Sequence, residues 1–125
     1  MYLKERKGES TRSVTTTIRL EYIETLKNNG ENINRTANSL LEDYCRELQH
    51  KSIHQVAIEA GKYRGRDSKK SKKVNLRIRS DFVDYLSFNG IAIGGVLRHL
   101  IGTYVTTLTK MQVLTGVTRA DEDRN

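Results

Sequence analysis

Six polar side chains in two short segments are of the types that can form hydrogen bonds with the edges of DNA bases. Each segment alternates polar with apolar residues, a pattern that places one set on one face of a β-strand. The outward sets are Ser13, Thr15 and Thr17, and Lys73, Asn75 and Arg77. Arg and Lys can donate to guanine, Asn can bond adenine at two atoms, and the Thr methyl group can contact thymine. The alternative interpretation is that these residues are merely the solvent side of a sheet.

The positive charge of the chain is concentrated just before and within the second segment. The net charge is +7, and residues 61–79 hold nine Lys and Arg against one Asp. The cations are Lys62, Arg64, Arg66, Lys69, Lys70, Lys72, Lys73, Arg77 and Arg79. A concentrated basic stretch favours a polyanionic partner. A solvated, flexible linker is the alternative for such a charge run considered alone.

The two segments open two copies of an internal repeat. Residues 14–48 align with residues 74–108 without a gap at an offset of 60, with 10 identities in 35 positions. Each copy reads as a short strand, a short helix, an Asn-Gly pair and a longer helix with one apolar stripe. We place the repeats at 13–48 and 73–117, the second with an extended last helix. A mobile arm at 1–12, a basic linker with a short helix at 49–72 and a frayed tail at 118–125 complete the chain.

Local signals predict where the helices begin and end. Ser80 and Asn32 are predicted N-caps, because their side chains can accept bonds from free backbone N–H groups. Gly30 and Gly90, each after an Asn, are predicted to end the first helix of each repeat in a left-handed conformation. A two-residue hairpin at each Asn-Gly pair is the alternative.

One repeat alone is too small to bury an adequate core, and a lone strand leaves its backbone groups unpaired. Both problems disappear if the two strands pair antiparallel and the helices interlock. The predicted fold is therefore mainly α, with a two-stranded antiparallel β-ribbon on a four-helix core, as a pseudo-dimer within one chain.

These features resemble the ribbon-helix-helix family of DNA-binding proteins, the group that includes the Arc and MetJ repressors. Residues 74–86 (VNLRIRSDFVDYL) are similar to the family's strand and first helix, and Gly-x-x-Ile at 30–33 and 90–93 matches its turn. The tandem arrangement is similar to small regulators encoded by archaeal viruses. The resemblance implies that the ribbon enters the major groove of double-stranded DNA, where the six outward residues read base edges.

The resemblance also implies phosphate contacts at the start of each second helix, through backbone N–H groups and the helix dipole. The predicted phosphate contacts are Arg19, Asn32, Ile33, Asn34, Lys69, Lys70, Lys72, Arg79, Ala92, Ile93 and Gly94. For Gly94 and its neighbour Gly95, close helix packing is the alternative.

Other classes of function find little support in the residues. The chain has 125 residues, one Cys and three His, with no phosphate-binding glycine motif and no catalytic constellation. We therefore expect no enzyme, metal, cofactor or small-molecule substrate. No apolar run is long enough for a membrane span, and the first residues lack the apolar core of a secretory signal. The expected location is the cytoplasm, or the host cytoplasm if the protein is viral.

The resulting hypothesis is a sequence-specific DNA-binding transcription regulator, most simply a repressor, that self-associates on DNA through residues 109–117. Because the outward residues of the two repeats differ, we expect an asymmetric DNA site. One alternative is an antitoxin-type autoregulator that also binds a partner protein. Another is an architectural protein that coats DNA without regard to sequence.

Overall fold

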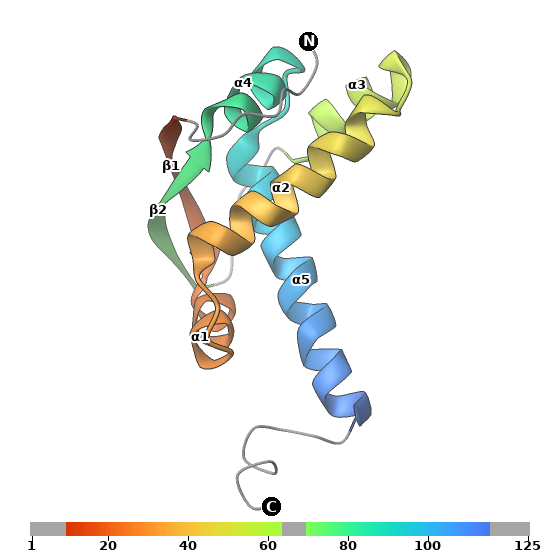
Figure 1. The fold of residues 1–125 in the computed structure, drawn as a ribbon. Helices are drawn as coiled ribbons and strands as arrows, with labels where there is room; N and C mark the ends of the chain where they lie inside the picture. Colours follow the sequence, from red (N-terminus) through yellow and green to blue (C-terminus); the bar gives the residue numbers. More distant parts are fainter. Residues whose placement is uncertain (1–9, 64–69, 116–125) are drawn as a thin grey trace, which may run out of the picture.

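The computed structural model describes residues 10–63 and 70–115, and its elements follow the order of the predicted repeat (Figure 1). They are β1 (Thr11–Arg19), α1 (Leu20–Asn28), α2 (Ile33–Gln49), α3 (Ile53–Lys62), β2 (Ser71–Arg79), α4 (Ser80–Phe88) and α5 (Ile93–Thr115). The predicted tail, and residues 1–9 of the predicted arm, lie outside the described residues. The tandem strand–helix–helix pattern is confirmed, and both β1 and β2 begin two residues before the predicted boundary of their repeat.

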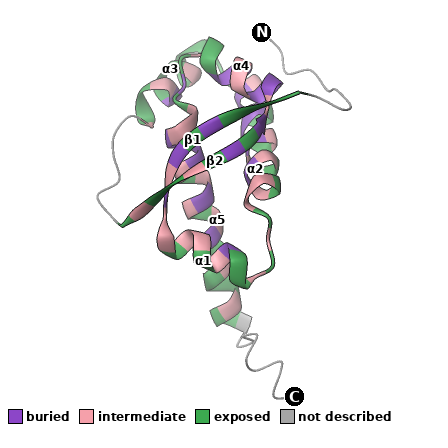
Figure 2. Ribbon diagram, turned by 90° about the vertical axis from the view of Figure 1, so that its left-hand side faces the viewer, coloured by how far each residue is buried: buried purple, intermediate pink, exposed green. Residues whose placement is uncertain are grey.

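The two strands form one antiparallel ribbon that lies against the helices. Thr11 faces Arg79 at one end, and Arg19 faces Ser71 at the other. With repeats offset by 60 residues, this register is symmetric about a pseudo-two-fold axis through the pair Thr15–Asn75. The alternation is confirmed, because within residues 13–18 and 73–78 the outer-face residues are exposed apart from the half-buried Thr17, and the inner-face residues are buried apart from the half-buried Val74 (Figure 2).

Glycine ends the first helix of both units, as the Asn-Gly pairs predict. Gly30 and Gly90 both have φ of 70°. The N–H of Gly30 bonds the carbonyl of Lys27 at 3.0 Å, and the N–H of Glu31 bonds that of Leu26 at 2.9 Å. This paired closure satisfies the last carbonyls of α1, and the same two bonds recur after Gly90. The hairpin alternative is wrong at both sites.

One of the two predicted N-caps is correct. The Asn32 side chain accepts from the backbone N–H groups of Asn34 at 2.9 Å and Arg35 at 3.2 Å. Ser80, by contrast, is the first residue of α4, and the N-cap is Arg79 without a side-chain bond. The ribbon extends to this point, because the Ser80 N–H donates to the carbonyl of Ser10 at 3.0 Å. The Ser80 hydroxyl accepts from that of Ser10 at 2.9 Å instead of capping the helix.

The core forms by exchange between the two units. The second helix of each unit packs against the strand of the other, α5 on β1 and α2 on β2, and these helices also pack on each other. Equivalent side chains from both units are almost completely buried, including Ile18 and Ile78, and Leu26 and Leu86. Neither unit can bury these side chains without its counterpart. Among the described residues, no single helix has the length and apolar character of a membrane span.

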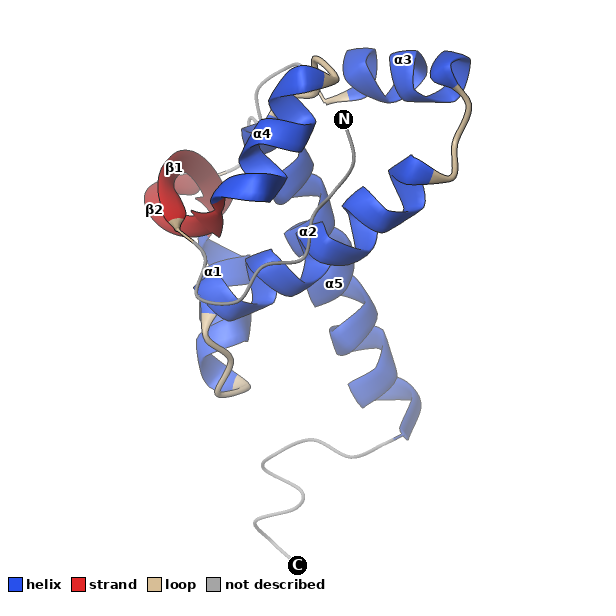
Figure 3. Cartoon of the chain, turned by 45° about the horizontal axis from the view of Figure 1, so that its top comes forward, coloured by secondary structure: helices blue, strands red, loops and turns tan. Residues whose placement is uncertain are grey.

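The linker helix α3 (Figure 3) packs on the core through the half-buried Val56 and Ala60, and it is also fastened by the buried carboxylate of Glu59. The Glu59 side chain accepts from the Tyr44 hydroxyl at 2.9 Å, from Lys62 Nζ at 3.2 Å and from the Tyr63 hydroxyl at 3.4 Å. Burial raises the pKa of Glu59, but the bonds from Tyr44 and Lys62 outweigh this effect and leave it below its usual value. Gly95 of α5 leaves room for the residue that follows α3, since a Cβ there would lie 2.0 Å from the carbonyl oxygen of Tyr63.

The Glu59 contacts predict a pH-dependent stability difference between the wild type and Glu59→Gln. Because the folded pKa is depressed, the contribution of Glu59 is present above its unfolded pKa near 4.3 and is lost as the pH falls through the folded value. We expect the variant to be less stable by about 1–2 kcal/mol at pH 7. Urea unfolding at pH 7 and pH 3 measures this difference. A gap that stays constant between the two pH values would contradict the assignment.

The lone thiol, Cys45, is predicted to be unreactive in the folded protein. It is fully buried, and burial, followed by the charge of Asp81, raises its pKa to about 12. An aromatic disulfide reagent at pH 8 should therefore label it only as fast as the protein unfolds. A cysteine introduced at the exposed position Ser39, as Ser39→Cys, should react at once. Rapid labelling of the wild type would show that the core around α2 is open.

Candidate nucleic-acid interface

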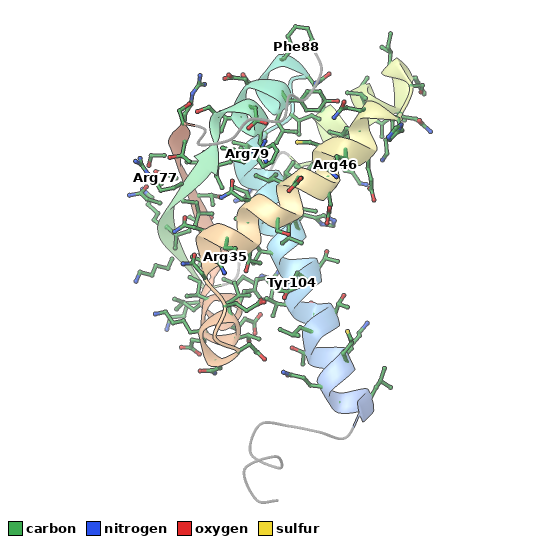
Figure 4. The ribbon with its side chains drawn as sticks, in the orientation of Figure 1. Arg35, Arg46, Arg77, Arg79, Phe88 and Tyr104 are labelled. Carbon is green, nitrogen blue, oxygen red and sulfur yellow. The ribbon has the colours of Figure 1, made fainter. Side chains whose placement is uncertain are left out.

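The six predicted base-contacting residues form three cross-strand pairs on the outer face of the ribbon. The pairs are Ser13–Arg77, Thr15–Asn75 and Thr17–Lys73. All six are exposed except Thr17, which is half-buried and accepts a 3.4 Å bond from Arg98 Nη1. Arg77 lies on the ribbon away from the helices (Figure 4).

The pairing distributes the hydrogen-bonding chemistry differently from what the linear sequence suggests. Both cations belong to β2, but the antiparallel register places each beside a hydroxyl of β1, at opposite ends of the ribbon. At the centre, the Thr15 hydroxyl donates to Asn75 Oδ1, which leaves the Asn75 amide N–H groups as donors toward the outside. Each end therefore presents one cation and one hydroxyl, with an amide at the pseudo-two-fold axis.

The outer edge of β2 is covered by two asparagines of α2, a role that the sequence did not indicate. Asn34 Oδ1 accepts from the N–H of Arg77 at 2.8 Å. Asn38 Oδ1 accepts from the N–H of Arg79 at 2.9 Å, and its Nδ2 donates to the carbonyl of Arg77 at 2.9 Å. These bonds satisfy backbone groups that an edge strand otherwise exposes. The only sequence signal is the spacing of two Asn residues four apart on one helix face.

The corresponding edge of β1 lacks this cover. The positions equivalent to Asn34 and Asn38 are Gly94 and Arg98. Gly94 accepts from the Thr16 hydroxyl at 3.1 Å through its carbonyl, and a Cβ at Gly94 would lie 3.2 Å from that hydroxyl oxygen. Thr16 packs closely on Gly94 and Tyr63 packs closely on Gly95, so close packing accounts for both glycines.

The two helix starts predicted to hold phosphate also differ from each other. At α2 the Asn32 side chain already occupies the N–H groups of Asn34 and Arg35. At α5 the equivalent residue is Ala92, whose side chain has no acceptor. Ile33 and Ile93 are half-buried. Contact of either helix start with phosphate stays a prediction.

The predicted phosphate-contacting arginines next to the ribbon are held by side chains of their own unit. Arg79 forms a two-point ion pair with the buried Asp81, at 3.1 and 2.7 Å, and its guanidinium lies 4.3 Å from the centre of the Phe82 ring. Arg19 donates to the Tyr22 hydroxyl at 3.0 Å and lies 3.7 Å from Glu21.

Of the predicted phosphate-contacting lysines, Lys70 is exposed just before β2 and Lys72 is exposed within it. Lys69 lies outside the described residues. Their contact with DNA stays a prediction.

Among residues 10–63 and 70–115, no cluster of three His, Cys, Asp or Glu residues is placed to hold a metal ion. His50 and His54 are exposed.

Comparisons with protein-family models, curated proteins and solved structures found no match.

Removing an asparagine that covers the edge of β2 should destabilise the protein measurably. Asn38→Ala removes the partners of the Arg79 N–H and the Arg77 carbonyl, which should lower the free energy of unfolding by about 1–2 kcal/mol. Chemical denaturation measures the effect. The neighbouring exposed Ser39→Ala is the control and should change stability by less than about 0.5 kcal/mol. Equal stability of both variants would show that the edge bonds contribute nothing.

Proposed function

We propose that this protein is a tandem ribbon-helix-helix DNA-binding protein that regulates transcription by occupying a promoter, most simply as a repressor. The observation that carries the proposal is the exposed outer face of the ribbon, where six residues of base-reading types stand in three cross-strand pairs. A two-stranded ribbon fits the major groove of B-form DNA, in which each base pair displays a distinct set of donors and acceptors. The mechanism is steric occupation of the site, with no covalent step.

The charge and the support of the ribbon favour the same function. Exposed Lys70, Lys72 and Lys73 attract phosphate, while Asn34 and Asn38 hold the β2 backbone that carries Arg77. Phosphate contacts supply affinity and register, and base contacts supply selectivity. The polar, mixed character of the outer face favours sequence-specific reading over coating by charge alone.

Self-association along DNA is part of the proposal. The far end of α5 exposes the neighbouring apolar side chains Met111, Val113 and Leu114 to 58–85% of their surfaces, an apolar group that a second molecule can cover. Molecules that line up on long DNA can meet through this end. Sedimentation of saturated complexes on duplexes of increasing length measures it, and strictly one protein per duplex would count against it.

The decisive test selects preferred duplexes from a random library and then compares variants on the selected site. Arg77→Ala should weaken binding to that site by roughly 5- to 150-fold, as expected for loss of a two-point guanine contact. Its binding to random DNA should change far less. Fluorescence anisotropy with labelled duplexes at fixed salt measures both affinities.

Arg46→Ala is the matched control, because Arg46 is an exposed arginine on α2 that pairs with Glu42 (2.7 Å) rather than lying on the ribbon (Figure 4). It should bind both DNAs like the wild type. Equal competition by random DNA against the selected site would instead favour the coating function. Absence of duplex binding would refute DNA reading altogether.

A further inference from the structure

The two ends of the ribbon differ in charge, although the repeats make them equivalent. We call the "arginine end" the part formed by residues 10–13 and 77–79, and the "lysine end" the part formed by residues 17–19 and 70–73. The pseudo-two-fold axis through Thr15–Asn75 exchanges these ends. In a homodimer they would be identical, whereas here each has its own side chains.

At the arginine end, acidic residues neutralise the cations that flank the outer face. Arg12 pairs with Asp84 at 2.6 Å, and Arg79 pairs with Asp81 at 2.7 Å. Arg77 remains exposed on the outer face. This end therefore presents one base-facing guanidinium with little surplus charge around it.

At the lysine end, the counterpart of Arg79 is Arg19, which lies 3.7 Å from Glu21, but the lysines are not neutralised in the same way among the described residues. Lys70, Lys72 and Lys73 are exposed, and within the described ranges no acidic side chain forms an ion pair with any of them. The axis relates Lys72 to Arg12 and Glu24 to Asp84, yet only the pair at the arginine end forms an ion pair.

The backbone support differs in the same direction. Three bonds from Asn34 and Asn38 fix the β2 backbone on both sides of the Arg77 peptide unit. At the positions equivalent to Asn34 and Asn38, Gly94 has no side chain, and Arg98 donates to the Thr17 hydroxyl at 3.4 Å. Selective hydrogen bonding to a base edge requires a side chain whose backbone is held in place, which the two asparagines provide for Arg77.

Resting on the proposed function, we propose that the ribbon binds DNA in one orientation only, a property that we call its polarity. The arginine end selects a G·C pair through Arg77, and the lysine end supplies most of the salt-dependent affinity through phosphates on the opposite flank. Lys73 and Arg77 are four residues apart, about 13 Å along the strand. This exceeds the Debye length of about 8–10 Å at physiological salt, so the charges of one end act mainly on their own flank.

The experiment uses the full-length protein and the selected duplex from the preceding test. The position at which Arg77→Ala relaxes selection marks the arginine side of the site. Duplexes are then shortened by equal steps on one flank or the other. Removing the lysine-side flank should weaken wild-type binding about tenfold or more at 0.1 M salt, and removing the arginine-side flank less than about twofold.

The double variant Lys70→Gln/Lys72→Gln should abolish this difference between the flanks while keeping base selection. It should also reduce the slope of the logarithm of the binding constant against the logarithm of the salt concentration by about two. Lys27→Gln/Lys51→Gln is the matched control: it removes the same charge from exposed sites on α1 and in the turn between α2 and α3, and it should bind like the wild type. Thermal unfolding confirms that all variants are folded.

Equal losses on both flanks, or a larger loss on the arginine side, would overturn the polarity while leaving the proposed function intact. Selection without any preferred site would also overturn it, since Arg77 would then select nothing. A protein that binds no duplex would refute the proposed function, and the polarity with it.

Discussion

The antiparallel pairing of β1 with β2 is the constraint on which the rest of the molecule depends. A two-stranded ribbon is marginal by itself, and a single strand has no partner for its backbone groups. The pairing brings two segments 60 residues apart into register, and this register sets the outer face, the axis and the packing of α5 on β1 and of α2 on β2. The helices in turn stabilise the ribbon by burying its inner side chains.

Features with a local cause were predictable from the sequence. The alternation around Ile18 and Ile78 determined which face is buried, and Gly30 and Gly90 occupy a conformation that other residues enter only at a cost. Ser80 was misread because a cap signal is local, whereas a ladder bond to Ser10, 70 residues away, decides its environment. The roles of Asn34 and Asn38 depend likewise on a strand that follows them by some forty residues.

Because both units belong to one chain, equivalent positions in them can hold different residues. In a homodimer every substitution appears twice, so one side of the axis cannot change without the other. Here equivalent tyrosines have separate partners: Tyr44 donates to Glu59 of the linker helix, and Tyr104 donates to Glu31 at 2.7 Å. The same freedom gives β2 an asparagine-covered edge and leaves β1 with Gly94, whose missing side chain permits the close approach of Thr16.

The linker helix explains why the partner of β1 is a strand of the same chain. Glu59 fastens α3 to α2, and the carbonyl of Tyr63 is seated on Gly95 at the start of α5. The start of α5 lies beside β1, because the Thr16 hydroxyl donates to the carbonyl of Gly94. At the other end of β1, the Leu20 N–H donates to the carbonyl of Lys70, just before β2. The connector is thus anchored on the core at Glu59 and Tyr63 before β2 begins at Ser71. Such anchoring lowers the entropy cost of closing the chain on itself, which favours internal pairing over exchange with a second molecule.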